Sequence, residues 1–189
     1  AATVGIKWTA TFEAFVSDPI GMATITNVFL AGYGSSPNLM KVNNRAVVFW
    51  RLAGGSVTEG DIAYAAELVR ANSGPVMIIL DAQCLSCPCI TCCSGNNPIS
   101  QWYSDPDATY GYPRISGFYE WAPVAWCTLS RTNRRTNTNN FVNRCVNGGM
   151  VPVLSTSPSW NIESWGYGEE GDNCGIDNPM ESESAIKTS

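Results

Sequence analysis

The 189-residue sequence predicts a mainly β domain with one helix, either a β-sandwich or a jelly-roll-like fold, stabilised by disulfides; an α+β fold is the alternative. Three observations support this prediction. Short apolar runs alternate with turns rich in Gly, Pro and Asn, eight cysteines are present, and only 14% of the residues are charged. The length suits one domain, and no repeat or linker divides residues 1–189.

An alternating segment opens the chain. Across residues 3–16 the apolar side chains Ile6, Trp8 and Phe12 share one face of an extended chain, and Lys, Thr and Glu occupy the other. We interpret residues 1–17 as an N-terminal strand arm. Such an arm could add to a neighbouring subunit's sheet edge, with these three apolar side chains making the contact.

The remaining elements follow from apolar runs and breakers. A capping pattern, with Ser56 as N-cap and Glu59 three residues later, predicts a helix that ends at Gly74-Pro75. The strand-helix-strand passage around this helix is the one hint of an α/β unit. The Thr/Asn-rich stretch with Arg131, Arg134 and Arg135 is predicted as a solvated loop. Further strands are expected at 22–30, 44–52, 75–80 and 151–154, and a flexible or partner-docked tail at 178–189.

The cysteines predict a disulfide hub. Five of the eight fall within ten residues, so full pairing needs at least one bridge inside this group and at least one leaving it. Persistent bridges require an oxidising compartment, which indicates a secreted, extracellular protein. The chain begins at a small residue, as after signal-peptide removal. The hub consists of Cys84, Cys87, Cys89, Cys92, Cys93, Cys127, Cys145 and Cys174.

A metal site is the alternative use of these thiols. Cys84, Cys87 and Cys89 have C-x-x-C-x-C spacing, and Trp102-Tyr103 follows. This segment resembles the α subunit of nitrile hydratases, in which such a trio binds non-haem iron or cobalt. The resemblance covers residues 84–103 and departs from that family at Leu85-Ser86 and at Pro88. It implies a cysteine-ligated metalloenzyme.

Composition excludes several function classes. The chain has no histidine, so a Ser-His-Asp or Cys-His mechanism is impossible. A net charge of -5 argues against nucleic acid as a partner. No apolar run approaches the roughly 20 residues that span a bilayer.

Aromatic and acidic residues supply the remaining candidate sites. Trp102, Tyr103, Trp121 and Trp126 could line a ligand platform for a glycan or an assembly interface. A pair of carboxylates could hydrolyse a glycosidic bond without histidine. The candidate acids are Asp81, Glu120, Glu163, Glu169 and Glu170.

Calcium is the one cofactor that the loops suggest. Residues 105–111 and 169–177 concentrate oxygen donors beside glycine turns, without matching an EF-hand. No other cofactor is expected.

These observations favour a structural protein over an enzyme. Low charge, scarce lysine, many aromatics and the strand arm predict a self-associating subunit of an extracellular assembly: a filament, sheath, surface layer or virion coat. It would form a homo-oligomer or polymer. The alternative is a secreted carbohydrate-binding protein or a two-carboxylate glycoside hydrolase.

Overall fold

The fold is a mostly parallel α/β arrangement, so the prediction of a mainly β sandwich or jelly roll is wrong. The structure, a computed structural model, describes residues 5–14, 18–52, 58–81, 99–119 and 131–154. Within them, five parallel strands form a sheet in the order β1-β3-β4-β5-β6, and the short β2 pairs with β3 in antiparallel fashion. The α+β alternative fails for the same reason, because strands and helices alternate along the chain.

The elements follow one another in a simple β-α succession. The strands are β1 (Ala10–Ala14), β2 (Lys41–Val42), β3 (Arg45–Leu52), β4 (Val76–Asp81), β5 (Gly117–Tyr119) and β6 (Val151–Val153). The helices are α1 (Pro19–Tyr33), α2 (Glu59–Ser73), α3 (Gln101–Ser104) and α4 (Arg131–Asn147). The predicted strands at 44–52, 75–80 and 151–154 are confirmed by β3, β4 and β6.

The segment predicted as a strand over residues 22–30 lies in helix α1. Asp18 is the N-cap, and its carboxylate accepts a hydrogen bond from the Gly21 backbone N–H. Pro19 takes the first helical position, where its fixed φ fits and no N–H is needed. Met22, Thr26 and Leu30 are buried at four-residue spacing. The cap and this period outweigh the β propensity of the intervening Ile, Thr, Val and Phe residues.

Helix α2 was expected, and its start lies two residues later than predicted. Thr58 is the N-cap, and its side chain and that of Asp61 each accept a hydrogen bond from the other's backbone N–H. The helix ends at Gly74, whose φ of 84° favours glycine. A capping box therefore exists, with different residues from those predicted.

Helix α4 occupies the stretch predicted as a loop. Its Asn and Thr residues have low helix propensity, which misled the sequence-based prediction. Phe141 and Cys145, four residues apart, both pack into the main core. Tertiary packing of this narrow apolar stripe stabilises a helix that propensity does not favour.

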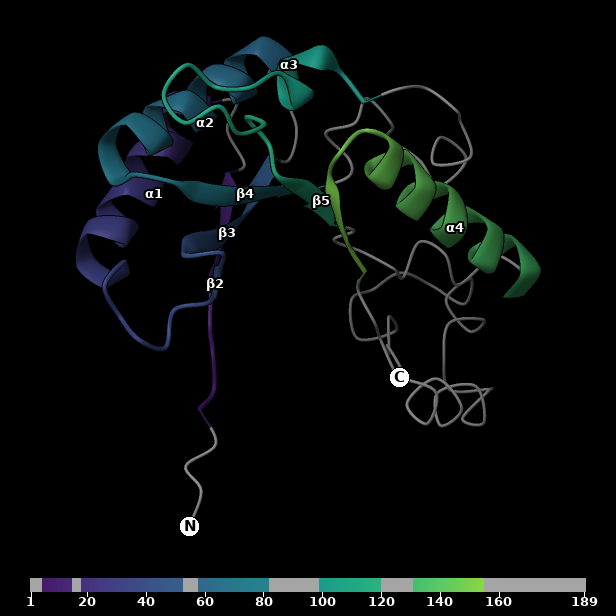
Figure 1. The fold of residues 1–189 in the computed structure, drawn as a ribbon, viewed down its shortest axis with the longest axis horizontal. Helices are drawn as coiled ribbons and strands as arrows, with labels where there is room; N and C mark the ends of the chain where they lie inside the picture. Colours follow the sequence, from purple (N-terminus) through teal and green to yellow (C-terminus); the bar gives the residue numbers. More distant parts are fainter. Residues whose placement is uncertain (1–4, 15–17, 53–57, 82–98, 120–130, 155–189) are drawn as a thin grey trace, which may run out of the picture.

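All four helices cover one face of the sheet. Residues of α1, α2, α3 and α4 belong to a single core cluster together with the side chains of β3 and β4 that point toward them. Figure 1 shows the helices along an arc over this face. The parallel strands follow one another across the sheet in chain order. Because crossovers between parallel strands are right-handed, the helices that connect them all lie on the same face. In the described part of the chain, no helix is long and apolar enough to cross a membrane.

Candidate active site

Four polar side chains lie in one row across the carboxyl end of the sheet. Glu13 of β1 is in register with Arg51 of β3, and Asp81 of β4 is in register with Tyr119 of β5. Arg51 and Asp81 each follow the paired residues Trp50 and Leu80. Side chains alternate between the faces of a strand, so the row points away from the helices.

Arg51 joins the two carboxylates of this row. Its Nη1 pairs with Oε1 of Glu13, and its Nε lies 3.6 Å from Oδ2 of Asp81. The Asp81 side chain is 1% exposed, whereas those of Glu13 and Arg51 are 26% and 20% exposed. We call Glu13, Arg51 and Asp81 the carboxylate trio. It has one buried side and one side open to solvent.

The face below the trio is apolar. Val47, Met77, Ile79 and Tyr119 form a second buried cluster, and Phe49 packs against it. The rings of Phe49 and Tyr119 meet edge to face, with centroids 5.1 Å apart. An apolar floor lowers the local dielectric and strengthens the electrostatic interactions of the charges above it.

The position of the trio is the one at which parallel sheets usually carry their sites. In α/β folds, active and ligand-binding sites lie at the carboxyl ends of the parallel strands, where several loops meet. Two carboxylates and one guanidinium carry a net charge of -1 when all three are ionised. Such a group can transfer protons, attack an electrophilic carbon or stabilise a developing cation.

The aromatic residues predicted to bind a ligand differ in their exposure to solvent. Trp102, in α3, is half-exposed, and its ring lies 3.8 Å from where a side chain at Gly60 would begin, over the first turn of α2. Tyr103 is buried and packs edge to face on Phe118, at 5.8 Å between ring centroids. Trp102 is therefore the described member that is open to a ligand. Trp121 and Trp126 lie outside the described residues.

The disulfide and metal predictions fall almost entirely outside the described residues. Cys84, Cys87, Cys89, Cys92, Cys93, Cys127 and Cys174 lie there, and Cys145 is buried in the core on α4. Where the structure describes the chain, it contains no group of three or more potential metal ligands among His, Cys, Asp and Glu. The bridges and the nitrile hydratase-like trio stay predictions.

Of the two predicted calcium loops, residues 105–111 are described. Asp107 is buried, with Oδ2 paired to Arg70 and Oδ1 accepting hydrogen bonds from the N–H groups of Thr109 and Tyr110. Both carboxylate oxygens of Asp107 therefore have partners within the protein. The loop at 169–177 lies beyond the described part, as do Glu120, Glu163, Glu169 and Glu170.

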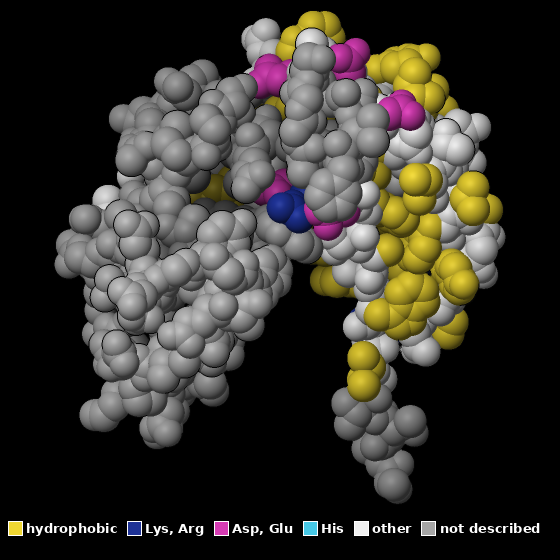
Figure 2. Space-filling view, turned by 180° about the vertical axis from the view of Figure 1, so that it is seen from behind, with side chains coloured by type: hydrophobic (Ala, Val, Ile, Leu, Met, Phe, Trp, Pro, Cys, Tyr) yellow, Lys and Arg dark blue, Asp and Glu magenta, His cyan; other side chains and the backbone are white. Residues whose placement is uncertain are grey.

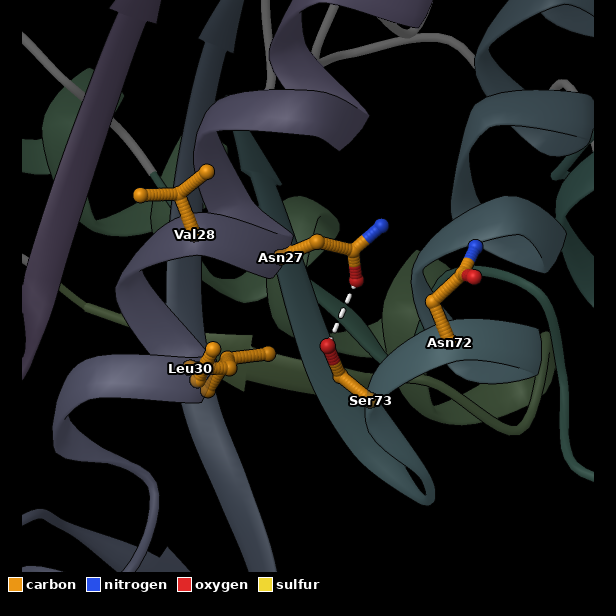
Figure 3. Close-up of a pocket in the computed structure, with 6 residues that line it drawn as sticks. Asn27, Val28, Leu30, Asn72 and Ser73 are labelled. Carbon is orange, nitrogen blue, oxygen red and sulfur yellow. Dashed lines mark hydrogen bonds between the residues drawn. The ribbon is translucent and has the colours of Figure 1, made fainter.

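An open groove lies between α1 and α2, away from the trio. It is lined by Asn27, Val28, Leu30, Ala31, Asn72 and Ser73. Figure 3 shows Asn27 and Ser73 facing each other across it, with Ser73 Oγ donating to Asn27 Oδ1 at 2.6 Å. Helices between parallel strands run back along the sheet, so the ends of α1 and α2 lie at its amino edge. Residues at that edge generally serve stability.

Sequence reasoning identified Asp81 as a candidate acid but missed Glu13 and Arg51. The alternating pattern of residues 3–16 places Glu13 on the polar face of a strand, and the sequence-based prediction does not include Arg51. The available signal was a charged residue at the last or second-last position of each strand, which follows an apolar run in the case of Arg51 and Asp81. Only the parallel order of β1, β3 and β4 brings the three together.

Comparison with protein-family models, with curated proteins and with solved structures found no match to this chain.

Proposed function

We propose that the chain is a carbohydrate-active enzyme, a glycoside hydrolase that uses Glu13 and Asp81 as its two carboxylates. The observation that carries the proposal is the pairing of both acids with Arg51 at the carboxyl edge of a parallel sheet. The absence of histidine from the sequence removes the commonest general base and leaves carboxylates as the natural acid and base.

The spacing of the strands supports this pairing of acids. β1 and β4 flank β3, and neighbouring strands lie about 4.8 Å apart, which places the two backbones about 9.6 Å apart. Both side chains lean toward the same guanidinium. Glycoside hydrolases hold their two carboxyl groups about 5 to 9.5 Å apart. Glu13 and Asp81 therefore start from strands at the correct separation.

The charge of the trio suits the reaction. Glycosidic bond cleavage passes through an oxocarbenium-like transition state that carries positive charge on the sugar ring. With Glu13 protonated as the acid, the trio of Glu13, Arg51 and Asp81 is neutral, and it reaches a net charge of -1 as Glu13 gives up its proton, while positive charge develops on the sugar. Only such differential stabilisation accelerates a reaction.

Burial assigns the two roles within the proposal. Asp81, buried and paired with Arg51, is the ionised carboxylate that attacks the anomeric carbon or activates a water molecule. Glu13, on the open side, transfers the proton to the leaving oxygen. Arg51 positions both groups.

The test is release of reducing ends from a panel of α- and β-linked glucans, mannans, xylans and chitin. Asp81→Asn and Glu13→Gln should each lower kcat at least about a thousandfold, because each replaces a reacting carboxylate with an amide. Glu67→Gln is the matched control. Glu67 pairs with Arg114 and belongs to α2, which covers the other face of the sheet, so its loss should leave kcat unchanged.

Two outcomes would overturn the proposal. One is absence of turnover on every polymer of the panel, and the other is full activity in Asp81→Asn. Binding of a glycan without turnover would instead identify a lectin, the other form of the carbohydrate alternative.

The role of an extracellular assembly subunit stays a prediction, as does secretion. Both depend chiefly on cysteines outside the described residues. The carboxylate trio supports the carbohydrate alternative more strongly than it supports a structural role, since a structural subunit needs no paired acids at a sheet edge.

A further inference from the structure

We infer that two copies of this chain form a dimer through the open edge of β1 and the adjacent flank of α1. This inference is independent of the proposed hydrolase. It rests on three features that lie on one side of the molecule: a strand edge with which no described strand pairs, an apolar patch and a helix without charge.

The first feature is the strand edge. β1 pairs with β3 on one side, and no described strand pairs with its other side. Alternate peptide groups of such an edge strand point outward and can pair with another chain. β1 carries Glu13 at its carboxyl end but has neither proline nor lysine to block pairing.

The second feature is an aromatic cluster along this edge. The Phe29 ring contacts those of Trp8, Phe12 and Tyr33, with centroid distances of 5.9, 5.3 and 5.4 Å. Trp8 and Tyr33 remain substantially exposed. The cluster packs α1 against β1 and the residues just before it. The exposed parts of the Trp8 and Tyr33 rings form an apolar surface there. It includes Trp8 and Phe12, two of the three residues predicted to form an assembly arm.

The third feature is the composition of α1. All fifteen of its residues, from Pro19 to Tyr33, are uncharged, although half of the helix surface faces solvent. Figure 2 shows hydrophobic side chains on the flank above the N-terminal segment, with no acidic or basic side chain among them. We define the edge patch as the exposed side chains of Ile6, Trp8, Ile25, Val28 and Tyr33, of which Val28 also borders the groove between α1 and α2.

The size of the edge patch is close to that required for a dimer. Half-exposed side chains of this kind present roughly 100 Å² each, so five present on the order of 500 Å². With the backbone edge of β1 added, the surface approaches the about 800 Å² per partner of a standard interface. A lipid surface is a poorer occupant, because α1 has no basic residue and the chain carries a net charge of -5.

A two-fold axis would satisfy both parts of this surface together. Antiparallel pairing of β1 with β1 of a second copy joins the two sheets into one. It also places the two α1 helices side by side on the same face, with the edge patches in contact. Such an interface is self-complementary and closes at two subunits.

The experiment measures the mass of the full chain by light scattering over a wide concentration range, in reductant. We expect a dimer that persists in reductant. Tyr33→Asp should weaken it about tenfold or more, because it places a charge in the apolar contact. Tyr64→Asp is the matched control, since Tyr64 is an equally exposed tyrosine on α2 and lies outside the edge patch. Circular dichroism checks that both variants fold.

Amide hydrogen exchange of residues 10–14 locates the interface, because these amides should exchange more slowly as the dimer forms. The inference is overturned by a monomer at all concentrations, by a dimer that reductant dissolves, or by equal weakening in both variants. It is also overturned if the exchange of residues 10–14 does not depend on concentration.

Discussion

Nη1 of Arg70 lies 2.9 Å from Oδ2 of Asp107, and both side chains are buried. Arg70 belongs to α2, and Asp107 belongs to the loop that follows α3, so this ion pair ties the helix layer to the approach to β5. Arg70 Nε also donates to the Val76 carbonyl at 3.2 Å. Burial lowers the pKa of Arg70, and the Asp107 carboxylate opposes that effect.

Loss of Arg70 should be strongly destabilising. Arg70→Met leaves the Asp107 carboxylate buried without its cation, which costs about 3 to 5 kcal/mol of unfolding free energy. In the double variant with Asp107→Asn the cost should fall short of the sum of the single costs. Urea denaturation measures all three. A single-variant loss below about 1 kcal/mol would show that the pair is not important for stability.

Thr26→Val should destabilise the core although it preserves shape. Trp50 Nε1 donates to Thr26 Oγ1 at 3.0 Å, and both residues are fully buried. Valine leaves this N–H without its acceptor, at a cost of about 1 to 3 kcal/mol. Thr24→Val is the control, because Thr24 is an exposed residue of the same helix with the same side-chain bond to the fourth residue before it. Thermal unfolding should show little change for Thr24→Val.

The capping box of α2 should make stability depend on pH in the acid range. Hydrogen bonds from the Thr58 side chain and backbone hold the pKa of Asp61 below its ordinary value of 3.8. The ionised form is therefore favoured in the folded state. Its contribution is complete above pH 3.8 and is lost as the pH falls through the lower, folded-state pKa. Melting temperatures of the parent and Asp61→Asn should converge over that range; divergence toward acid would contradict the prediction.

Gly117→Ala should disturb the junction of β5 and β6. A Cβ at residue 117 would lie 2.2 Å from the carbonyl oxygen of Val151, a backbone atom that cannot move without shifting β6. We expect a loss of about 1 to 3 kcal/mol. Gly32→Ala is the control, because a Cβ there meets nothing within 4 Å and alanine favours the helix by about 0.5 to 1 kcal/mol. Urea denaturation should therefore shift in opposite directions.

The middle of the chain was predictable because local signals agree there. The continuous apolar runs of β3 and β4 and the capping and terminating residues of α2 all indicate a strand-helix-strand unit. Helices α1 and α4 were missed for opposite reasons. α1 is rich in residues that favour strands, and α4 is rich in residues that favour loops. Each is stabilised by packing against the sheet, which no local pattern reports.

The candidate site was predictable only in part. Asp81 stands out as an acid at the end of an apolar run. Its meeting with Glu13 depends on β1 and β4 lying on either side of β3 in parallel. In an antiparallel sheet of the same order, β3 would run the other way, and Arg51 would lie at the opposite edge from both acids. The error in fold class therefore hid the pairing of the acids.

The strand order of the sheet also bears on how the protein is made. Each of the parallel strands pairs with the one synthesised just before it. A nascent chain emerging from the ribosome thus finds its partner already in place, and α2 can dock on α1 before β5 exists. Translation stalled after β4 would leave that strand's edge without β5, and chains with such unpaired edges are prone to aggregate.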